Sequence, residues 1–190
     1  MSATAAPMGL TPVYHPSGLD RASAYTINPT YNTSIFKGDP VILNTNGTVT
    51  VGAAATALLG VFAGCEYVDA TGKPTYSNFY PASQSVQANS VITAWVYTDP
   101  EIVYEVQGVS ALTQAAIGDE ADISTYAAGS TSTGLSIVSL ATGTLAGAAA
   151  QKQFRIIGAG LAPDNALTDT YPVLRVTLAQ SQLRAATTAI

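Results

Sequence analysis

The sequence predicts an all-β protein, a small antiparallel β-barrel or β-sandwich with long Gly/Ala/Ser/Thr loops and one short helix. Short runs of β-branched and aromatic residues recur along the chain, and they end in Gly, Pro, Asn or Asp, which is typical of strands joined by turns. Hydrophobic residues make up 47% of the chain, enough for a sizeable core. Strands that alternate with turns rather than with helices favour a barrel or sandwich over β-α-β units.

The chain is expected to divide into an extended N-terminal arm (residues 1–31), a single β-rich domain (residues 32–180) and a C-terminal tail (residues 181–190). Charged residues make up only 10% of the chain, against roughly 25% in a typical soluble domain. Such a chain either exposes a neutral surface or buries much of its surface against other chains.

The charge pattern excludes two classes of partner. The net charge is −5, and the seven basic residues form no cluster, so neither nucleic acid nor a membrane surface is an expected partner. The uncharged stretch at residues 51–65, which apolar residues flank, is shorter than the ~20 apolar residues that span a bilayer. The start of the chain lacks a secretion-signal pattern, and the lone Cys65 suits a reducing compartment, so synthesis in a host cytoplasm is expected.

The arm at residues 1–31 contains four prolines, which disfavour a helix, and it shows no strand-like alternation. It is either unstructured or ordered against a partner, and both interpretations stay open. Its aromatic and histidine side chains are candidate partner contacts: Tyr14, His15, Tyr25 and Tyr31.

The clearest local structure is a hairpin within residues 34–51. A turn at Gly38, Asp39 and Pro40 precedes the strand at residues 41–43. Asn46 and Gly47 tolerate positive φ, so they predict a tight turn of the primed type before the strand at residues 48–51. Mutations in this hairpin are expected to unfold the protein, whereas deletion of residues 1–30 is expected to leave it folded.

Residues 59–67 form the next expected strand, and its glycines predict a bulge, a bend or a close approach of another chain segment. The aromatic segment at residues 75–82 adds three candidate partner contacts, Tyr76, Phe79 and Tyr80. A strand at residues 91–97 is apolar on both sides, so burial of both faces is expected. With the alternating strand at residues 102–107 it is expected to form a second hairpin.

In the last third of the chain, Ser110 and Gly118 are the expected ends of the short helix, residues 110–117. The acidic residues Asp119, Glu120 and Asp122 form either a calcium-binding loop or a solvated turn. Further strands are expected at residues 135–140, 153–158 and 171–178.

No arrangement of residues predicts catalysis, so the protein is expected to be non-enzymatic and to need no cofactor. His15 is the only histidine, and it lies in the proline-rich arm, so an activated serine or cysteine nucleophile is not expected. One Cys and one His do not give the spacing of a zinc site. A glycosidase-like pair could be drawn from Asp99, Glu101 and Glu105, but Glu105 lies on the outward face of the strand at residues 102–107, where a charge is ordinary.

Three segments carry a family resemblance: Lys37-Gly38-Asp39-Pro40-Val41, residues 46–51 (NGTVTV) and residues 59–64 (LGVFAG). Their order resembles that of tailed-bacteriophage capsid decoration proteins, also called cement or head-stabilising proteins. Residues 96–107 and 164–176 are similar to phage virion proteins of comparable length. The resemblance implies a non-enzymatic structural protein, often a homotrimer, that binds the outside of the assembled capsid and clamps neighbouring major capsid subunits.

Two alternatives stay open. One is another virion component, such as a head fibre, a tail-tube protein or a head-completion protein. The other is a carbohydrate-binding β-module that uses Trp95 and the tyrosines, since exposed aromatic rings can form a platform for sugars.

Overall fold

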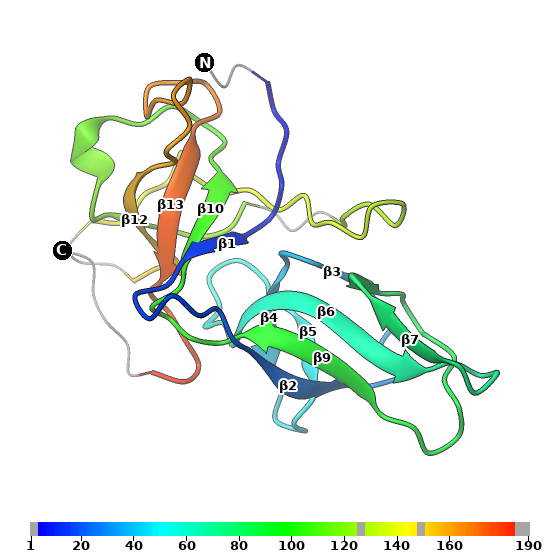
Figure 1. The fold of residues 1–190 in the computed structure, drawn as a ribbon. Coiled ribbons are helices and arrows are strands. Elements are labelled where there is room, and N and C mark those ends of the chain that lie inside the picture. Colours follow the sequence, from blue (N-terminus) through cyan, green and yellow to red (C-terminus); the bar gives the residue numbers. More distant parts are fainter. Residues whose placement is uncertain (1–3, 125–127, 148–150, 185–190) are drawn as a thin grey trace.

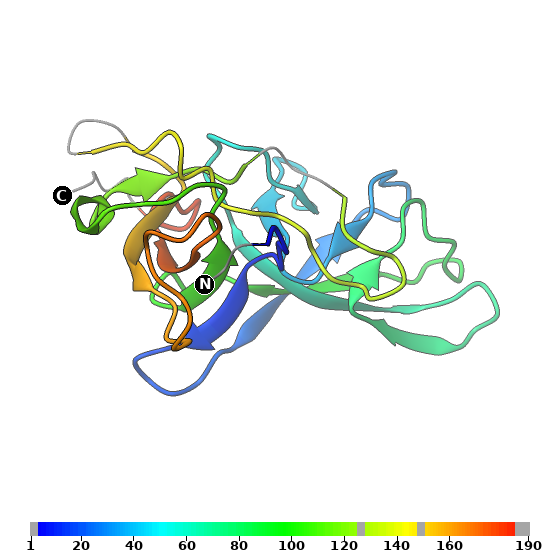
Figure 2. The ribbon, with the colours of Figure 1, turned by 90° about the horizontal axis from the view of Figure 1, so that it is seen from above.

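The computed structural model describes residues 4–124, 128–147 and 151–184, and the protein is all-β as the sequence predicts (Figure 1). The strands pair antiparallel in sheets of five, six and two strands. Within these three ranges the only helical element is a single 3-10 turn, η1 (Gln114–Ala116), and no helix is long and apolar enough to cross a membrane. Figures 1 and 2 show the two large sheets as adjoining lobes, each with its own core.

The five-stranded sheet, called the first sheet below, joins strands from both ends of the chain to strands from its middle. Its core contains the fully buried Tyr104, Phe154 and Leu174, and it also takes in Leu58 and Val61 from the segment that enters the other sheet. Its strands follow the order β1 (Thr11–Tyr14), β10 (Val103–Gln107), β13 (Val173–Leu178), β12 (Phe154–Ala159) and β11 (Glu120–Ala121).

The six-stranded sheet, called the second sheet, curls around a core that includes Phe62 and Tyr80. Its two ends meet only at a bridge between Thr26 and Thr48 within the described residues, so the barrel is not closed. A small sheet pairs β3 (Ile35–Phe36) with β8 (Phe79–Tyr80). The second sheet has the order β2 (Ala22–Ile27), β9 (Ile92–Tyr97), β6 (Gly60–Val68), β4 (Pro40–Leu43) and β5 (Val49–Val51), and β7 (Pro74–Ser77) also pairs with β6.

The expected N-terminal arm is part of both sheets. β1 pairs with β10 in the first sheet, and β2 pairs with β9 in the second, so these residues are ordered against their own chain. Leu10 is 1% exposed and Ile27 is fully buried. Because deletion of residues 1–30 removes one strand from each sheet, we now predict that the deletion destabilises the fold, in place of the expectation that the protein stays folded.

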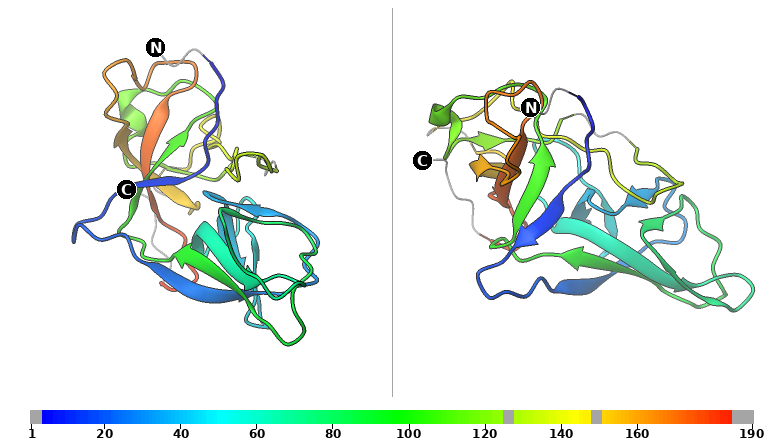
Figure 3. Two further views of the ribbon diagram at one scale, coloured as in Figure 1. Left: turned by 45° about the vertical axis from the view of Figure 1, so that its right-hand side comes forward. Right: turned by 45° about the horizontal axis from the view of Figure 1, so that its top comes forward.

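The expected second hairpin is also wrong. β9 belongs to the second sheet and β10 to the first, so the chain crosses between the sheets at residues 98–102 instead of turning back (Figure 3). The N-terminal segment crosses beside it, between β1 and β2. β9 buries only the face of Ile92, Ala94 and Val96, and its other face is half-buried rather than covered.

The first hairpin has the expected strands but a different turn. Val41 lies opposite Val51 and Leu43 lies opposite Val49. The turn is a three-residue loop, since the backbone N–H of Asn44 donates to the carbonyl of Thr48. Only Gly47 in this loop has a positive φ (77°).

Asn46, expected to share the positive φ, instead accepts hydrogen bonds from the backbone N–H and the hydroxyl of Thr48 through its side-chain oxygen. The primed two-residue turn is therefore wrong. An Asn side chain that bonds two residues ahead favours a longer loop.

The turn at Gly38, Asp39 and Pro40 is a buried junction. The fully buried Asp39 carboxylate accepts the backbone N–H of Phe36 at 2.8 Å, and the Asp39 carbonyl accepts the N–H of Phe62 at 2.9 Å. Gly38 donates to the Phe62 carbonyl at 2.8 Å and accepts from the N–H of Leu10 at 2.9 Å. This junction therefore joins the N-terminal segment, β3, β4 and β6.

Three smaller expectations also change. The short helix shrinks to η1, because Ser110 hydrogen-bonds Thr142 rather than capping a helix. Residues 135–140 form isolated bridges rather than a regular strand. In the expected tail, Gln182 bonds the backbone N–H and carbonyl of Leu43, while residues 185–190 lie outside the described residues.

The N-terminal segment offers a matched pair of leucines for measuring its role. Leu10 is buried and Leu19 is 57% exposed. Leu10→Ala is expected to lower the free energy of unfolding by about 2–5 kcal/mol, because it leaves a cavity in the core. Leu19→Ala is expected to change it by less than about 0.5 kcal/mol. Urea denaturation checks both, and equal midpoints would contradict the placement of this segment in the core.

The junction gives a second prediction. Asp39→Ala leaves the buried N–H of Phe36 without its acceptor, so the free energy of unfolding is expected to fall by about 1–3 kcal/mol. Asp164→Ala, at an exposed aspartate, is the control and is expected to leave stability unchanged. Thermal and urea denaturation of both variants measure the difference, and an unchanged Asp39→Ala variant would refute the structural role of this carboxylate.

Candidate functional site: an aromatic groove on the second sheet

The outer face of the second sheet carries the only tryptophan of the chain, Trp95. Trp95 alternates with the buried residues of β9 and is half-buried. Its partner on β6 is Gly64, which follows a register shift and has a φ of 151°. A Cβ at Gly64 would lie 2.9 Å from the carbonyl oxygen of Ser77, so only glycine fits there. Gly64 therefore places no side chain beside Trp95, its partner on β9.

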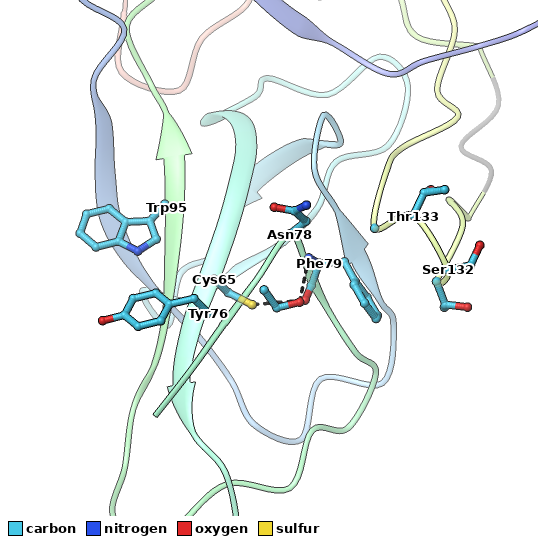
Figure 4. A pocket seen from close by; sticks show the side chains of 10 residues that line it. Cys65, Tyr76, Asn78, Phe79, Trp95, Ser132 and Thr133 are labelled. Carbon is cyan, nitrogen blue, oxygen red and sulfur yellow. Dashed lines mark hydrogen bonds between the residues drawn. The ribbon is translucent and has the colours of Figure 1, made fainter. Parts of the chain in front are cut away.

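A second aromatic side chain lies near Trp95 on this face. Tyr76 of β7 pairs with Glu66 of β6, and its side chain is 79% exposed. In the close view, the Tyr76 and Trp95 rings lie near each other, on the same side of the sheet (Figure 4). These two rings are the aromatic part of the site, which we call the aromatic groove.

Two depressions border Tyr76. The larger one, about 440 Å³, contains no charged residue in its lining. It is lined by Cys65, residues 76–79, Trp95 and residues 131–134. The smaller one, about 250 Å³, includes Glu66, Tyr67, Thr75, Ser90 and Thr93. Tyr76 lines both, so the two depressions share this residue.

The wall opposite the aromatic rings is a loop far away in sequence. The backbone N–H of Lys37 donates to the carbonyl of Gly134 at 3.0 Å, which fixes the loop against β3. Phe79 stacks on Phe36 with ring centroids 5.5 Å apart. Ser132 and Thr133 lie on this side of the groove (Figure 4). The Ser132 hydroxyl shares a hydrogen bond with that of Ser130, and the Thr133 hydroxyl accepts the N–H of Leu135; with Asn78, these residues form the polar part of the lining.

Cys65 lines the groove but is not a nucleophile. Its thiol is 2% exposed and donates to the carbonyl of Phe79 at 3.4 Å. Burial raises the pKa of Cys65 to about 12, so the thiolate form is scarce at neutral pH. Cys65 is therefore a buried thiol of the core.

His15 lies in the loop between β1 and β2, where its Nδ1 is 2.6 Å from the Oγ of Ser17, two residues ahead. Its Nε2 lies 3.1 Å from Asp99 Oδ2, and its Nδ1 accepts the backbone N–H of Ser17 at 3.1 Å. The hydrogen bond from the Glu101 N–H, assisted by His15, lowers the pKa of Asp99. The imidazole therefore joins the two chain crossings at the corner between the sheets.

The acidic cluster is neither a calcium loop nor a solvated turn. Glu120 lies in β11, is fully buried, and pairs with Arg155 at 2.9 Å. Asp122 pairs with Lys152 at 3.3 Å. In the described residues, no three His, Cys, Asp or Glu side chains gather as metal ligands. Glu120 and Asp122 instead form ion pairs with Arg155 of β12 and with Lys152, just before β12.

The candidate partner contacts of the sequence separate by burial. Tyr80 is fully buried, with its hydroxyl donating to the Tyr31 carbonyl at 2.9 Å, so Tyr80 cannot meet a partner. Tyr31 stacks on it and accepts the N–H of Val51. His15, Tyr25 and Phe79 are half-buried, like Tyr31. Only Tyr14 and Tyr76 among these candidates are exposed, at 55% and 79%.

The sequence predicted part of this groove. The glycines of residues 59–67 predicted a bulge, and the register shift at Gly64 confirms it. Trp95 was expected to be buried on both sides, and only the pairing with Gly64 explains its half-exposed face. The contribution of residues 131–134 carried no sequence signal, because a polar loop of this composition fits many positions.

Comparison of the chain with protein-family models, with curated proteins and with solved structures finds no match.

The burial of Cys65 predicts its reactivity. A thiol-specific reagent such as dithionitrobenzoate is expected to react at least about 100-fold more slowly with the folded protein at pH 8 than with the protein unfolded in guanidinium chloride. The reason is that the folded thiol is shielded and protonated. Release of the coloured thiolate measures both rates. Equal rates would mean that Cys65 is accessible in the folded state.

Proposed function

We propose that the protein is a non-enzymatic structural protein of a tailed-phage virion, which binds the outside of the assembled capsid and clamps neighbouring major capsid subunits. The resemblance of three segments to decoration proteins supports this proposal, and these segments form one unit of β4, β5 and the start of β6. The low charge of the chain suits a protein that makes extensive contacts.

The observation that carries the proposal is that four apolar side chains, which follow one another in the sequence of the N-terminal segment, are exposed. Met8, Val13, Tyr14 and Leu19 are between 37% and 57% exposed, although the segment itself is fixed in the fold. A rigid segment loses little conformational entropy on binding, so its apolar side chains are effective contacts. We call these four residues the N-terminal contact row.

A cavity of about 230 Å³ adjoins this row. It is the kind of pocket into which a partner inserts an anchoring side chain. Residues of the N-terminal segment and of both β6 and β9 line it, among them Met8, Leu10, Pro12, Phe62 and Tyr97.

The edge of the first sheet favours side-chain contact over addition of a strand. β1 ends this sheet, but it contains Pro12 and a register shift between Pro12 and Tyr14. Proline and bulges blunt an edge against pairing with another strand. A homotrimer would repeat the contact around a ring, so that later contacts form at high effective concentration.

The test adds purified protein to expanded capsids that lack it. The protein is expected to sediment with the capsids and to raise their melting temperature. The double variant Val13→Ser, Tyr14→Ser is expected to bind at least about tenfold more weakly, because two apolar contacts are lost. Tyr76→Ser, at an exposed tyrosine outside the row, is the control and is expected to bind normally.

Two outcomes decide against this proposal. Wild-type protein that neither binds nor stabilises the capsids contradicts decoration. Immunogold label at the tail or at one vertex, rather than over the whole shell, would assign the chain to a tail tube, a head fibre or a head-completion complex.

A further inference from the structure

The aromatic groove is not part of the N-terminal contact row, and it has the features of a ligand site. Trp95 and Tyr76 come from different strands of the second sheet, and their rings lie on one side of it (Figure 4). Nothing in the described fold needs Tyr76 at this position, since its side chain is 79% exposed. An exposed aromatic ring beside a half-exposed indole is a surface that a flat apolar ligand face can cover.

The polar groups of the groove identify the chemistry of that ligand. Asn78, Ser132 and Thr133 carry amide and hydroxyl groups, which both donate and accept hydrogen bonds. The larger depression has no Asp, Glu, Lys, Arg or His in its lining. Phosphate and carboxylate ligands would need a cation or a row of backbone N–H donors. A ligand rich in neutral hydroxyl groups fits this lining.

Negative charge near the groove also disfavours anionic ligands. The only ionisable carboxylate beside the groove is Glu66, in the smaller depression, and the chain has a net charge of −5. Glu66 can accept hydrogen bonds from ligand hydroxyls, and it repels carboxylates and sulfates. The groove therefore selects neutral ligands.

The shape of the groove favours a chain over a single small molecule. The two depressions, about 440 and 250 Å³, share Tyr76. The larger one alone lies within the usual size of ligand sites, roughly 300–1,000 Å³. A linear ligand that places one unit against Trp95 and the next unit past Tyr76 occupies both.

We propose that the aromatic groove binds a neutral polysaccharide chain, with one sugar ring stacked on Trp95 and its neighbour against Tyr76. A sugar ring has an apolar C–H face and hydroxyls at its edge, so it matches both the rings and the polar part of the lining. The C–H bonds carry a partial positive charge that the negative faces of aromatic rings attract. This binding does not depend on attachment to a capsid, because the groove and the N-terminal contact row are separate surfaces.

The test uses the fluorescence of Trp95, the only tryptophan. Cellohexaose, maltohexaose, laminarihexaose and chitohexaose are titrated up to about 10 mM, where even weak binding is visible. At least one is expected to shift the emission and to saturate. Polygalacturonate, an anionic polymer, is expected to bind at least about tenfold more weakly than that hexasaccharide.

Tyr76→Ala is expected to weaken binding of the active hexasaccharide at least about tenfold, because it removes the ring of the residue that lines both depressions. Its side chain is mostly exposed, so the variant keeps the fold. Tyr14→Ala, at an exposed tyrosine of the first sheet, is the matched control and is expected to bind like wild type. Calorimetry with Trp95→Ala, whose fold circular dichroism verifies, is expected to show no binding.

The proposal is overturned if none of the four hexasaccharides shifts the emission, or if Tyr76→Ala and Tyr14→Ala bind equally well. Loss of capsid binding by Tyr76→Ala, with no sugar bound by wild type, would also overturn it and would assign the groove to a protein partner. Decoration itself is tested separately by the N-terminal variants, so either proposal can fail while the other stands.

Discussion

The buried carboxylate of Asp39 is the constraint on which the arrangement of the chain depends. Its hydrogen bond to the N–H of Phe36 holds a turn whose backbone groups are bonded to other segments. Leu10 donates to Gly38 from the N-terminal side, and Phe62 bonds both Gly38 and Asp39 from β6. A buried polar group is tolerated only where hydrogen bonds replace water, so the position of these segments is tightly specified.

The same junction positions the groove. Lys37, between Phe36 and Gly38, donates its N–H to Gly134 and accepts the N–H of Ser136 through its carbonyl. The loop at residues 131–134 is therefore held in place next to the junction, while Tyr76 belongs to β7 and Trp95 to β9. The two walls of the groove come from parts of the chain that only the folded core brings together.

Features that depend on residues close together in the sequence were predictable. The all-β class, the strands of the first hairpin and the bulge at Gly64 follow from alternation and turn residues, and the structure confirms them. The pairing of β9 and β10 was not predictable in this way, because residues 98–102 can either reverse a strand or lead it to another sheet. Which one occurs depends on β1 and β2, which offer each strand a different partner.

The burial of individual side chains was not predictable from the sequence for the same reason. Trp95 and Tyr80 both lie in apolar aromatic runs, yet one is half-exposed and the other fully buried. The difference is set by Gly64, which places no side chain beside Trp95, and by the backbone carbonyl of Tyr31, which accepts the Tyr80 hydroxyl. Neither neighbour is close in sequence, so periodicity alone cannot distinguish the two rings.

The strand order of the first sheet has a consequence for how the protein is made. Its central strand, β13 (Val173–Leu178), lies more than 150 residues after β1 (Thr11–Tyr14), so this sheet cannot form until β13 has left the ribosome. Contacts between residues so distant in sequence form slowly, since a long loop must close first. A truncated product that lacks β13 leaves Tyr104 and Phe154 without their central partner. Only chains that contain β13 therefore complete the sheet, and products that lack it expose core side chains to proteases.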